Sequence, residues 1–152
     1  MKIDITKRKQ LNILLNNLKE DTPAGWGLMK PQNVVEHLAK TLQCSNGKKQ
    51  LAQRSSEHEG NLAKQAFIYT DLEMSKGIKS PLAGELPDPF KFSSLDEAKR
   101  NLNNELDDFE SYFDGNPNAT FIQPRLGKLN NREWIIFHNK HFTHHFKQFG
   151  LI

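Results

Sequence analysis

Cysteine is nearly absent from this sequence: its 152 residues include only Cys44, so no disulfide can form within the chain. A lone cysteine is typical of proteins kept in a reducing compartment, and a cytoplasmic location is therefore expected. Long apolar runs are also missing, because no stretch approaches the roughly 18 residues that a membrane-spanning helix needs. The N-terminal segment lacks the apolar block and cleavage site of a secretory signal. A disulfide-stabilised scaffold is excluded, and no association with a membrane is predicted.

A basic stripe of the kind that binds nucleic acid is missing as well. The formal net charge is +3, but the basic residues are scattered in small groups with acidic residues between them. No stacking aromatic residues alternate with these groups, so we predict a solvated surface and no nucleic-acid partner. Hydrophobic residues make up 36% and charged residues 26% of the chain, which is typical of a soluble globular protein. The length predicts one domain over residues 1–152.

Strand signals are nearly absent, whereas apolar residues recur at helical spacing. In residues 4–20, leucines follow the i, i+3, i+4, i+7 pattern of an amphipathic helix. A second helix is expected from Pro31 to shortly before Gly47, and a weaker third one over residues 60–75. The third would use these apolar positions: Leu62, Ala66, Tyr69 and Leu72. The predicted fold class is all-α.

Capping signatures predict where the last two helices begin. Ser94 with Glu97 opens a fourth helix, and Asn130 with Glu133 opens a last one that runs to Gly150. Residues 115–124 are predicted to form a turn-rich connection. Residues 77–93 carry three prolines and several small residues, which predicts a long ordered loop. Loops of that length in a compact domain are usually functional, so we expect a lid-like loop beside four main helices.

Histidines are concentrated near the C-terminus, where four of the six fall within residues 138–145. On a helix, His138, His141 and His145 share one narrow stripe with Trp134, while His144 lies off to the side. Apolar residues flank this stripe, so it should face the interior. Imidazole nitrogens in a core are costly unless a partner satisfies them. The pattern therefore predicts that the nitrogens of these histidines have a bound partner.

A divalent metal ion is the partner that the spacing favours. His141 and His145 are four residues apart, which places their Cβ atoms about 5–6 Å from each other on one helix face. Two imidazoles make only a bidentate pair, and His37, at the edge of the apolar stripe of the second helix, is the candidate third ligand. Three neutral imidazoles leave a coordination position open, as in catalytic metal sites.

Several assignments stay open at this point. His138 could replace His141 as a ligand, lie behind the ligands or line a pocket above the ion. The histidines could instead form a hydrogen-bonded cluster without metal. No general base is certain: Glu36 should point away from His37, and Glu73 or Glu85 could enter the site. His58 is expected at the surface, and Cys44 is expected as a small buried filler. The remaining candidates are aromatic pocket walls: Trp26, Trp134, Phe90 and Phe92.

Both ends of the chain resemble the DinB/YfiT-like superfamily. The C-terminal stretch is similar to a branch whose last helix reads Glu-Trp, then Lys-His-x-x-His-His, then Gln-Phe-Gly, as residues 133–134 and 140–150 do here. The N-terminal part resembles the same branch at residues 26–29 and 36–38, and the connection before the last helix does so at residues 121–129. The middle of the chain, from about residue 47 to 93, matches poorly.

The resemblance implies a four-helix bundle in which three histidines hold a divalent metal, most often zinc or nickel. Carried over to this sequence, the ligands are His37, His141 and His145, which favours His141 over His138. Some relatives are thiol S-transferases and others look like metal-dependent hydrolases, which implies a small-molecule substrate. Relatives often dimerise, so the resemblance suggests a homodimer. Where many relatives have Arg-Gly-Gln after the last ligand, this chain has Phe-Lys-Gln, so only Gln148 matches.

Overall fold

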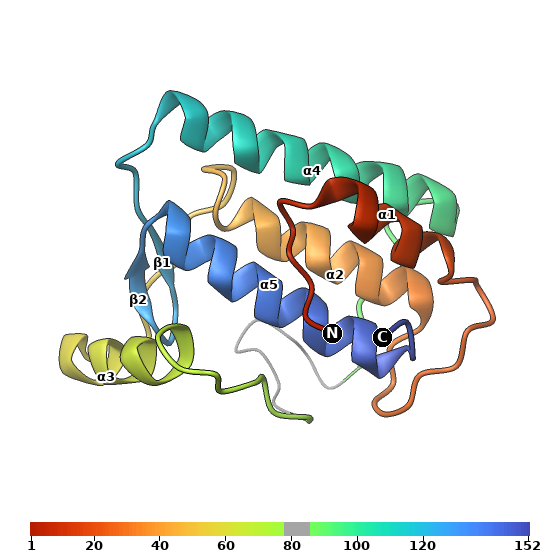
Figure 1. The fold of residues 1–152 in the computed structure, drawn as a ribbon, viewed down its shortest axis with the longest axis horizontal. Coiled ribbons are helices and arrows are strands. Elements are labelled where there is room, and N and C mark those ends of the chain that lie inside the picture. The colour runs from red at the N-terminus through yellow and green to blue at the C-terminus, as the bar shows by residue number, and fades with distance from the viewer. Residues whose placement is uncertain (78–85) are drawn as a thin grey trace.

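The protein is mostly helical, as predicted. The computed structural model describes residues 1–77 and 86–152 (Figure 1). Within these ranges the elements are, in chain order, α1 (Arg8–Asn16), α2 (Pro31–Gln43), α3 (Glu57–Ile68), α4 (Leu95–Gly115), β1 (Phe121–Gln123), β2 (Gly127–Leu129) and α5 (Asn131–Gln148). None of the helices in the described ranges is long and apolar enough to cross a membrane.

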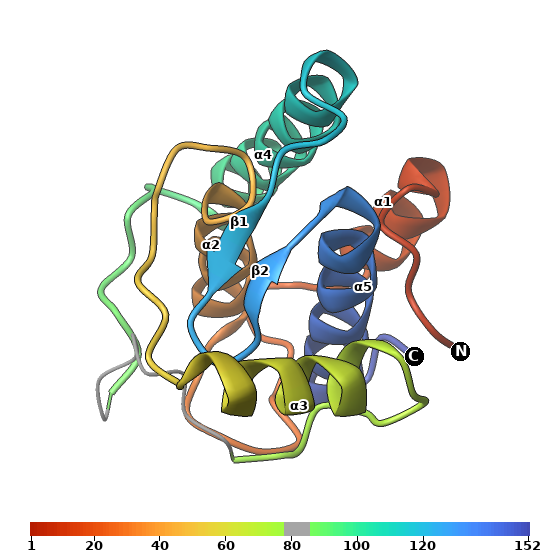
Figure 2. The same cartoon turned by 90° about the vertical axis from the view of Figure 1, so that its left-hand side faces the viewer.

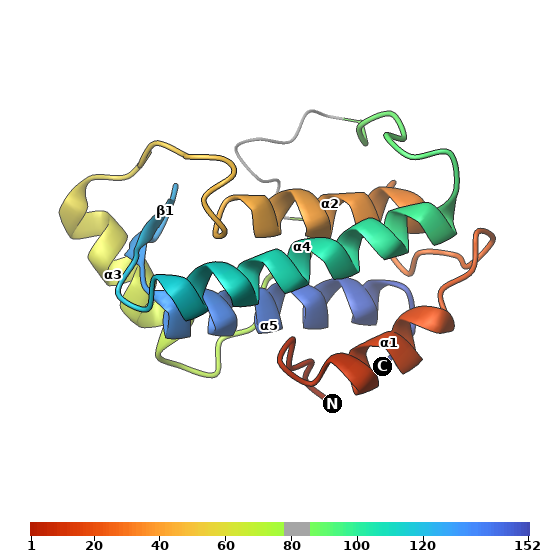
Figure 3. The ribbon, with the colours of Figure 1, turned by 90° about the horizontal axis from the view of Figure 1, so that it is seen from above.

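The core lies where α2, α4 and α5 run alongside one another, with α1 against their flank (Figures 1 and 3). The apolar stripe of α4 is buried along its whole length, from Leu95 to Phe113, and the leucine stripe of α1 is buried at Leu11 and Leu15. From α2 the core receives Leu38 and Leu42, which are at most 1% exposed. Burial of these side chains positions α2 against α5, which is the contact that carries the candidate site.

Helix starts agree with the capping signatures. The Ser94 side chain accepts a hydrogen bond from the backbone N–H of Glu97, and α4 begins at the next residue. Asn130 and Glu133 form a reciprocal capping box at the start of α5. α2 begins at Pro31, as expected from the fixed φ of proline in a first turn.

The third helix is placed wrongly by the sequence pattern. It covers Glu57–Ile68 rather than residues 60–75, and all four of its expected core positions are exposed. It buries Ile68 instead, and packs against β2 and α5 at one end of the molecule (Figure 2). The cause is tertiary: the ammonium of Lys140 on α5 donates to the carbonyls of Phe67, Thr70 and Leu72, which holds the chain after Ile68 in a non-helical course.

Two smaller differences concern the N-terminus and the turn-rich connection. The first helix is shorter than residues 4–20, because residues 1–7 run along α5 with the backbone N–H groups of Ile3 and Ile5 bonded to its side chains. Residues 115–124 lead into a short antiparallel hairpin in which Phe121 pairs with Leu129. Three-residue strands give too few alternating positions to be read from sequence.

The predicted lid-like loop is described only in part. Residues 78–85, which include Glu85, lie outside the described residues. The segment from Leu86 to Ser93 is tied to α2: the Glu36 carboxylate accepts the backbone N–H groups of Lys91 and Phe92. Gln32 Nε2 also donates to the carbonyl of Phe92 at 2.7 Å. Glu36 therefore points away from His37, as expected, and anchors the loop.

Candidate metal centre

Three histidines from two helices meet between α2 and α5. His141 Nε2 lies 2.9 Å from His37 Nε2 and 3.1 Å from His145 Nε2. One nitrogen from each ring lies within 4.8 Å of the other two, which is close enough for all three to bind one ion. The two histidines of α5 meet because residues four apart share a helix face. His37 reaches them because its neighbour Leu38, 1% exposed, holds α2 against the core.

Burial keeps the three rings neutral. It lowers the pKa of His37 to about 4 and that of His145 to about 3. The charge of Lys40 adds to the effect at His37, and the neighbouring His37 ring adds to it at His145. Burial and the neighbouring histidines also lower the pKa of His141 well below its ordinary value. An imidazole must be neutral to offer a lone pair to a metal. At pH 7 the cluster can therefore act as a set of three neutral nitrogen donors.

The geometry and the surroundings of the rings fit a metal ion. Tetrahedral zinc with bonds of about 2.0–2.1 Å separates its nitrogen ligands by about 3.4 Å, and the two observed separations are within about 0.5 Å of that value. His145 Nδ1 lies 2.7 Å from Gln148 Oε1, the outward hydrogen bond that metal-bound histidines commonly make. His141 Nδ1 is buried without a hydrogen-bond partner among the described residues. Zinc and nickel both accept such imidazole ligands.

His138 stands apart from the three converging rings. It is completely buried, and its Nε2 lies 2.7 Å from Ser45 Oγ. The single hydroxyl proton of Ser45 goes to the carbonyl of Leu42, so His138 Nε2–H must be the donor to Ser45. The ring stacks on Trp134 with centroids 5.3 Å apart, and burial lowers its pKa to about 3. The alternative in which His138 replaces His141 is not supported by this arrangement.

The other two histidines take peripheral positions. His144 is half-buried on the flank of α5, where its Nδ1 lies 3.2 Å from the carbonyl of Met74. Its ring centroid is 4.9 Å from that of His145 and 5.5 Å from that of Trp26. His58 is exposed on α3, as expected. His144 therefore lies beside His145 on the flank of α5.

No carboxylate of residues 1–77 and 86–152 joins the three histidines. Glu73 is exposed and pairs with Lys147, 2.9 Å away, and Glu36 is engaged by the loop amides. Of the aromatic candidates, Trp134 is core and Phe90 is 49% exposed. Cys44 is buried, and burial raises the pKa of its thiol, which agrees with a filler role. The described part of the chain thus brings together three histidines that could hold a metal ion, with no carboxylate among them.

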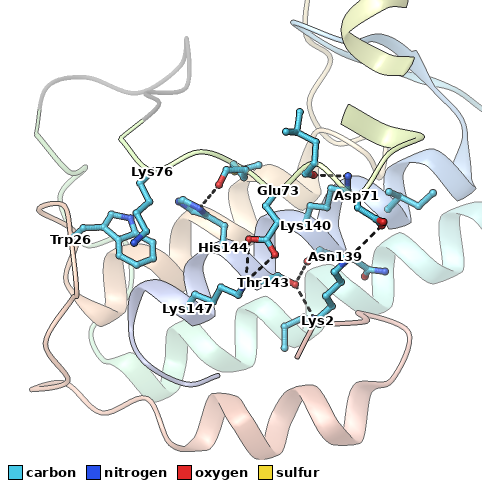
Figure 4. Close-up of a pocket in the computed structure, with 14 residues that line it drawn as sticks. Lys2, Trp26, Asp71, Glu73, Lys76, Asn139, Lys140, Thr143, His144 and Lys147 are labelled. Atoms are coloured by element: carbon cyan, nitrogen blue, oxygen red, sulfur yellow. Dashed lines mark hydrogen bonds and ion pairs between the residues drawn. The ribbon is translucent and has the colours of Figure 1, made fainter. Parts of the chain in front are cut away.

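A cavity of about 240 Å³ lies beside α5, with His144 among its lining residues (Figure 4). One wall is the chain from Asp71 to Lys76, and the opposite wall is the outer face of α5. Lys140, His144 and Lys147 reach across from α5 to hold that chain through its carbonyls and through Glu73. Trp26 closes one end, with the ammonium of Lys76 over its ring at 4.3 Å.

Comparison of the chain with protein-family models, with curated proteins and with solved structures finds no match. Function is therefore inferred from the site itself. Sequence reasoning anticipated the three converging histidines but missed the partners of His138 and His145. Ser45, the partner of His138, left no signal in the sequence. Gln148 stands three residues after His145, a spacing that brings side chains together on a helix and could have predicted their contact.

Proposed function

We propose that the protein binds one divalent metal ion, zinc or nickel, through His37, His141 and His145, and that it is a metal-dependent enzyme acting on a small molecule. The convergence of the three Nε2 atoms between α2 and α5 is the observation that carries this proposal. The rings are neutral, they come from two helices, and one of them already has an outward partner in Gln148.

We further propose membership of the DinB/YfiT-like superfamily and its four-helix bundle. The support is the order of the ligands: one histidine on the helix that begins at Pro31, and two, four residues apart, on the last helix. This proposal rests on the sequence resemblance together with that placement. It includes the homodimer and the cytoplasmic location that the resemblance and the lone cysteine suggest.

The chemistry expected of such a centre is that of a Lewis acid with an open position. A metal held by three imidazoles lowers the pKa of bound water towards about 7 or stabilises a thiolate, which suits hydrolysis or thiol transfer. The protein's own part is to supply three neutral nitrogens in a nearly dry setting, since His141 and His145 are only 5% and 7% exposed. His144, whose ring lies beside that of His145, and Trp26 both line the cavity beside α5.

The second candidate is a non-catalytic, metal-stabilised helical bundle that acts through protein partners. It is favoured by one observation: no carboxylate from the described residues joins the histidines to serve as a general base. In that case the metal would stabilise the fold, and its removal would lower the free energy of unfolding without abolishing any reaction.

The first test is metal content. The untagged protein, purified without chelator, is expected to hold about one equivalent of metal per chain, and His37→Ala and His145→Ala are expected to lose it, because two remaining imidazoles bind too weakly. His58→Ala is the matched control, because His58 is exposed on α3 and is not one of the three converging histidines. Elemental analysis of the four proteins gives the answer.

Metal-free parent protein that also fails to bind added zinc or nickel would rule out the centre. If metal is present, thiol-transfer and hydrolysis substrates separate the two roles. An enzyme loses turnover on chelation and regains it with metal, whereas a structural metal changes only the thermal midpoint.

A further inference from the structure

Gln148, the last residue of α5, is a buried glutamine whose side-chain amide makes hydrogen bonds through both its oxygen and its nitrogen. It is 4% exposed. Its Oε1 lies 2.7 Å from His145 Nδ1, and its Nε2 lies 2.8 Å from the carbonyl oxygen of Trp26. One side chain thus connects a ring of the three-histidine cluster to the chain that precedes α2.

The orientation of the Gln148 amide follows from its partners. A backbone carbonyl oxygen can only accept a hydrogen bond, so the group that faces Trp26 O must be the amide NH₂. The amide oxygen then faces His145, and an oxygen can only accept. His145 must therefore carry its proton on Nδ1. A neutral imidazole has one N–H, so His145 Nε2 is left with a lone pair.

That lone pair points to the place where the rings converge. His145 Nε2 lies 3.1 Å from His141 Nε2, which in turn lies 2.9 Å from His37 Nε2. A ligand nitrogen must present a lone pair to a metal, and the hydrogen bond on the opposite nitrogen selects the tautomer that does so. The carbonyl of Trp26 thereby determines, through Gln148, which nitrogen of His145 is free to bind.

The chain around Trp26 is shaped to make this contact. The backbone N–H of Gly25 donates to the carbonyl of Gln148 at 2.7 Å. A Cβ atom at Gly25 would lie 3.3 Å from that same oxygen, and one at Gly27 would lie 3.0 Å from Gln148 Nε2. Gly27 also has a φ of +77°, which favours glycine. Two glycines therefore let residues 25–27 approach the end of α5 closely enough for both hydrogen bonds.

We infer that Gln148 is a positioning residue that holds His145 in its Nδ1–H tautomer, with Nε2 free for a metal, and so couples the 25–27 segment to the three-histidine centre. The role in metal binding rests on the proposed function, whereas the tautomer does not. Outward partners of metal-bound histidines are worth about 10–100-fold in metal affinity. Gln148 should contribute an effect of that size without touching the ion.

The tautomer is tested in the unaltered protein without metal. Long-range ¹H–¹⁵N correlation spectra at pH 8, with His145 assigned by comparison with His145→Ala, should show the proton on Nδ1. Finding it on Nε2 would overturn the inference, whatever the behaviour of any variant.

The coupling is tested with two substitutions. Gln148→Met keeps a similar volume but removes both hydrogen bonds, so zinc affinity measured by chelator competition should fall about 10–100-fold. Gln148→Glu keeps an oxygen for His145 Nδ1–H but cannot donate to Trp26. Gln148→Glu should therefore keep most of the zinc affinity of the parent protein. Amide exchange of residues 25–27 should increase in both variants.

Gln32→Met is the matched control. Gln32 is also buried, at 7% exposed, and its Nε2 also donates to a loop carbonyl, that of Phe92. It should lower stability without lowering zinc affinity. An equal loss of affinity in Gln32→Met, or no loss in Gln148→Met, would overturn the inference. A parent protein that binds no zinc would instead overturn the proposed function, and the spectra would still decide the tautomer.

Discussion

At the scale of single residues, Glu105 is a carboxylate buried in α4, at 4% exposed, and it organises the chain that follows α2. Its oxygens accept hydrogen bonds from Gln43 and Asn46 and from the ammonium of Lys48, at 2.9–3.1 Å. The turn held in this way carries Ser45, the hydrogen-bond partner of His138. A buried carboxylate is tolerated only when its oxygens are satisfied in this manner.

Glu105→Ala is therefore expected to lower the free energy of unfolding by about 2 kcal/mol, because it leaves buried donors without an acceptor. Asp108→Ala is the matched control: this carboxylate bonds the same Lys48 ammonium, but its side chain is 50% exposed. Exposed ion pairs contribute little, so the control should change stability by no more than about 0.5 kcal/mol. Urea unfolding of both variants measures the difference, and equal losses would contradict this account of Glu105.

At the scale of elements, α5 presents different chemistry on different faces. His141 and His145 face α2, and Phe142 and Phe146 enter the core. Its outer face carries Lys140, His144 and Lys147, spaced four and three residues apart, which fasten the chain after α3 (Figure 4). Lys140 makes most of these hydrogen bonds, since its ammonium donates to three backbone carbonyls.

Lys140→Met is expected to release residues 69–76 from α5. Amide exchange of these residues should increase, and the free energy of unfolding should fall by about 1–2 kcal/mol, because three carbonyls lose their donor. Lys147→Met removes a lysine from the same face whose ammonium, among the described residues, pairs only with the exposed Glu73, so its effect should be smaller. If exchange of residues 69–76 stayed unchanged in Lys140→Met, the lysine would not be what ends α3 at Ile68.

At the scale of the whole molecule, three buried histidines and the half-buried His37 make stability depend on pH. The pKa of His138 is lowered by burial to about 3, and those of His37, His141 and His145 are lowered too. In the unfolded chain these groups return towards the ordinary value of 6.5, so the unfolded state binds more protons as the pH falls. Their contribution to stability is complete above pH 6.5 and is lost progressively below it, down to the native pKa values.

Between pH 6.5 and 5 each of these histidines should cost about 1.5 kcal/mol of unfolding free energy, because only the unfolded chain is protonated there. Urea unfolding with chelator present measures the loss without a contribution from metal. His138→Gln should reduce the loss across this interval by about 1.5 kcal/mol, whatever its effect at neutral pH. An unchanged pH dependence would mean that His138 is protonated to the same extent in both states.

Much of the helical architecture could be predicted from the sequence, because the signals that start a helix lie close together along the chain. Caps and periodicity act within a few residues, so the starts of α2, α4 and α5 and the buried stripe of α4 were all predicted correctly. α3 was not, because its end depends on Lys140, which is 70 residues away from Thr70. The short hairpin escaped prediction because three-residue strands carry almost no periodic signal.

The candidate site, too, could be predicted from the sequence only in part. That His141 and His145 share a face was determined by the sequence itself, since spacing along a helix is a local property. That His37 comes within 2.9 Å of His141, that His138 turns to Ser45 and that Gln148 reaches the carbonyl of Trp26 were decided only by the tertiary structure. Those contacts join segments between 93 and 122 residues apart, and they depend on how each helix is rotated about its axis when the core packs.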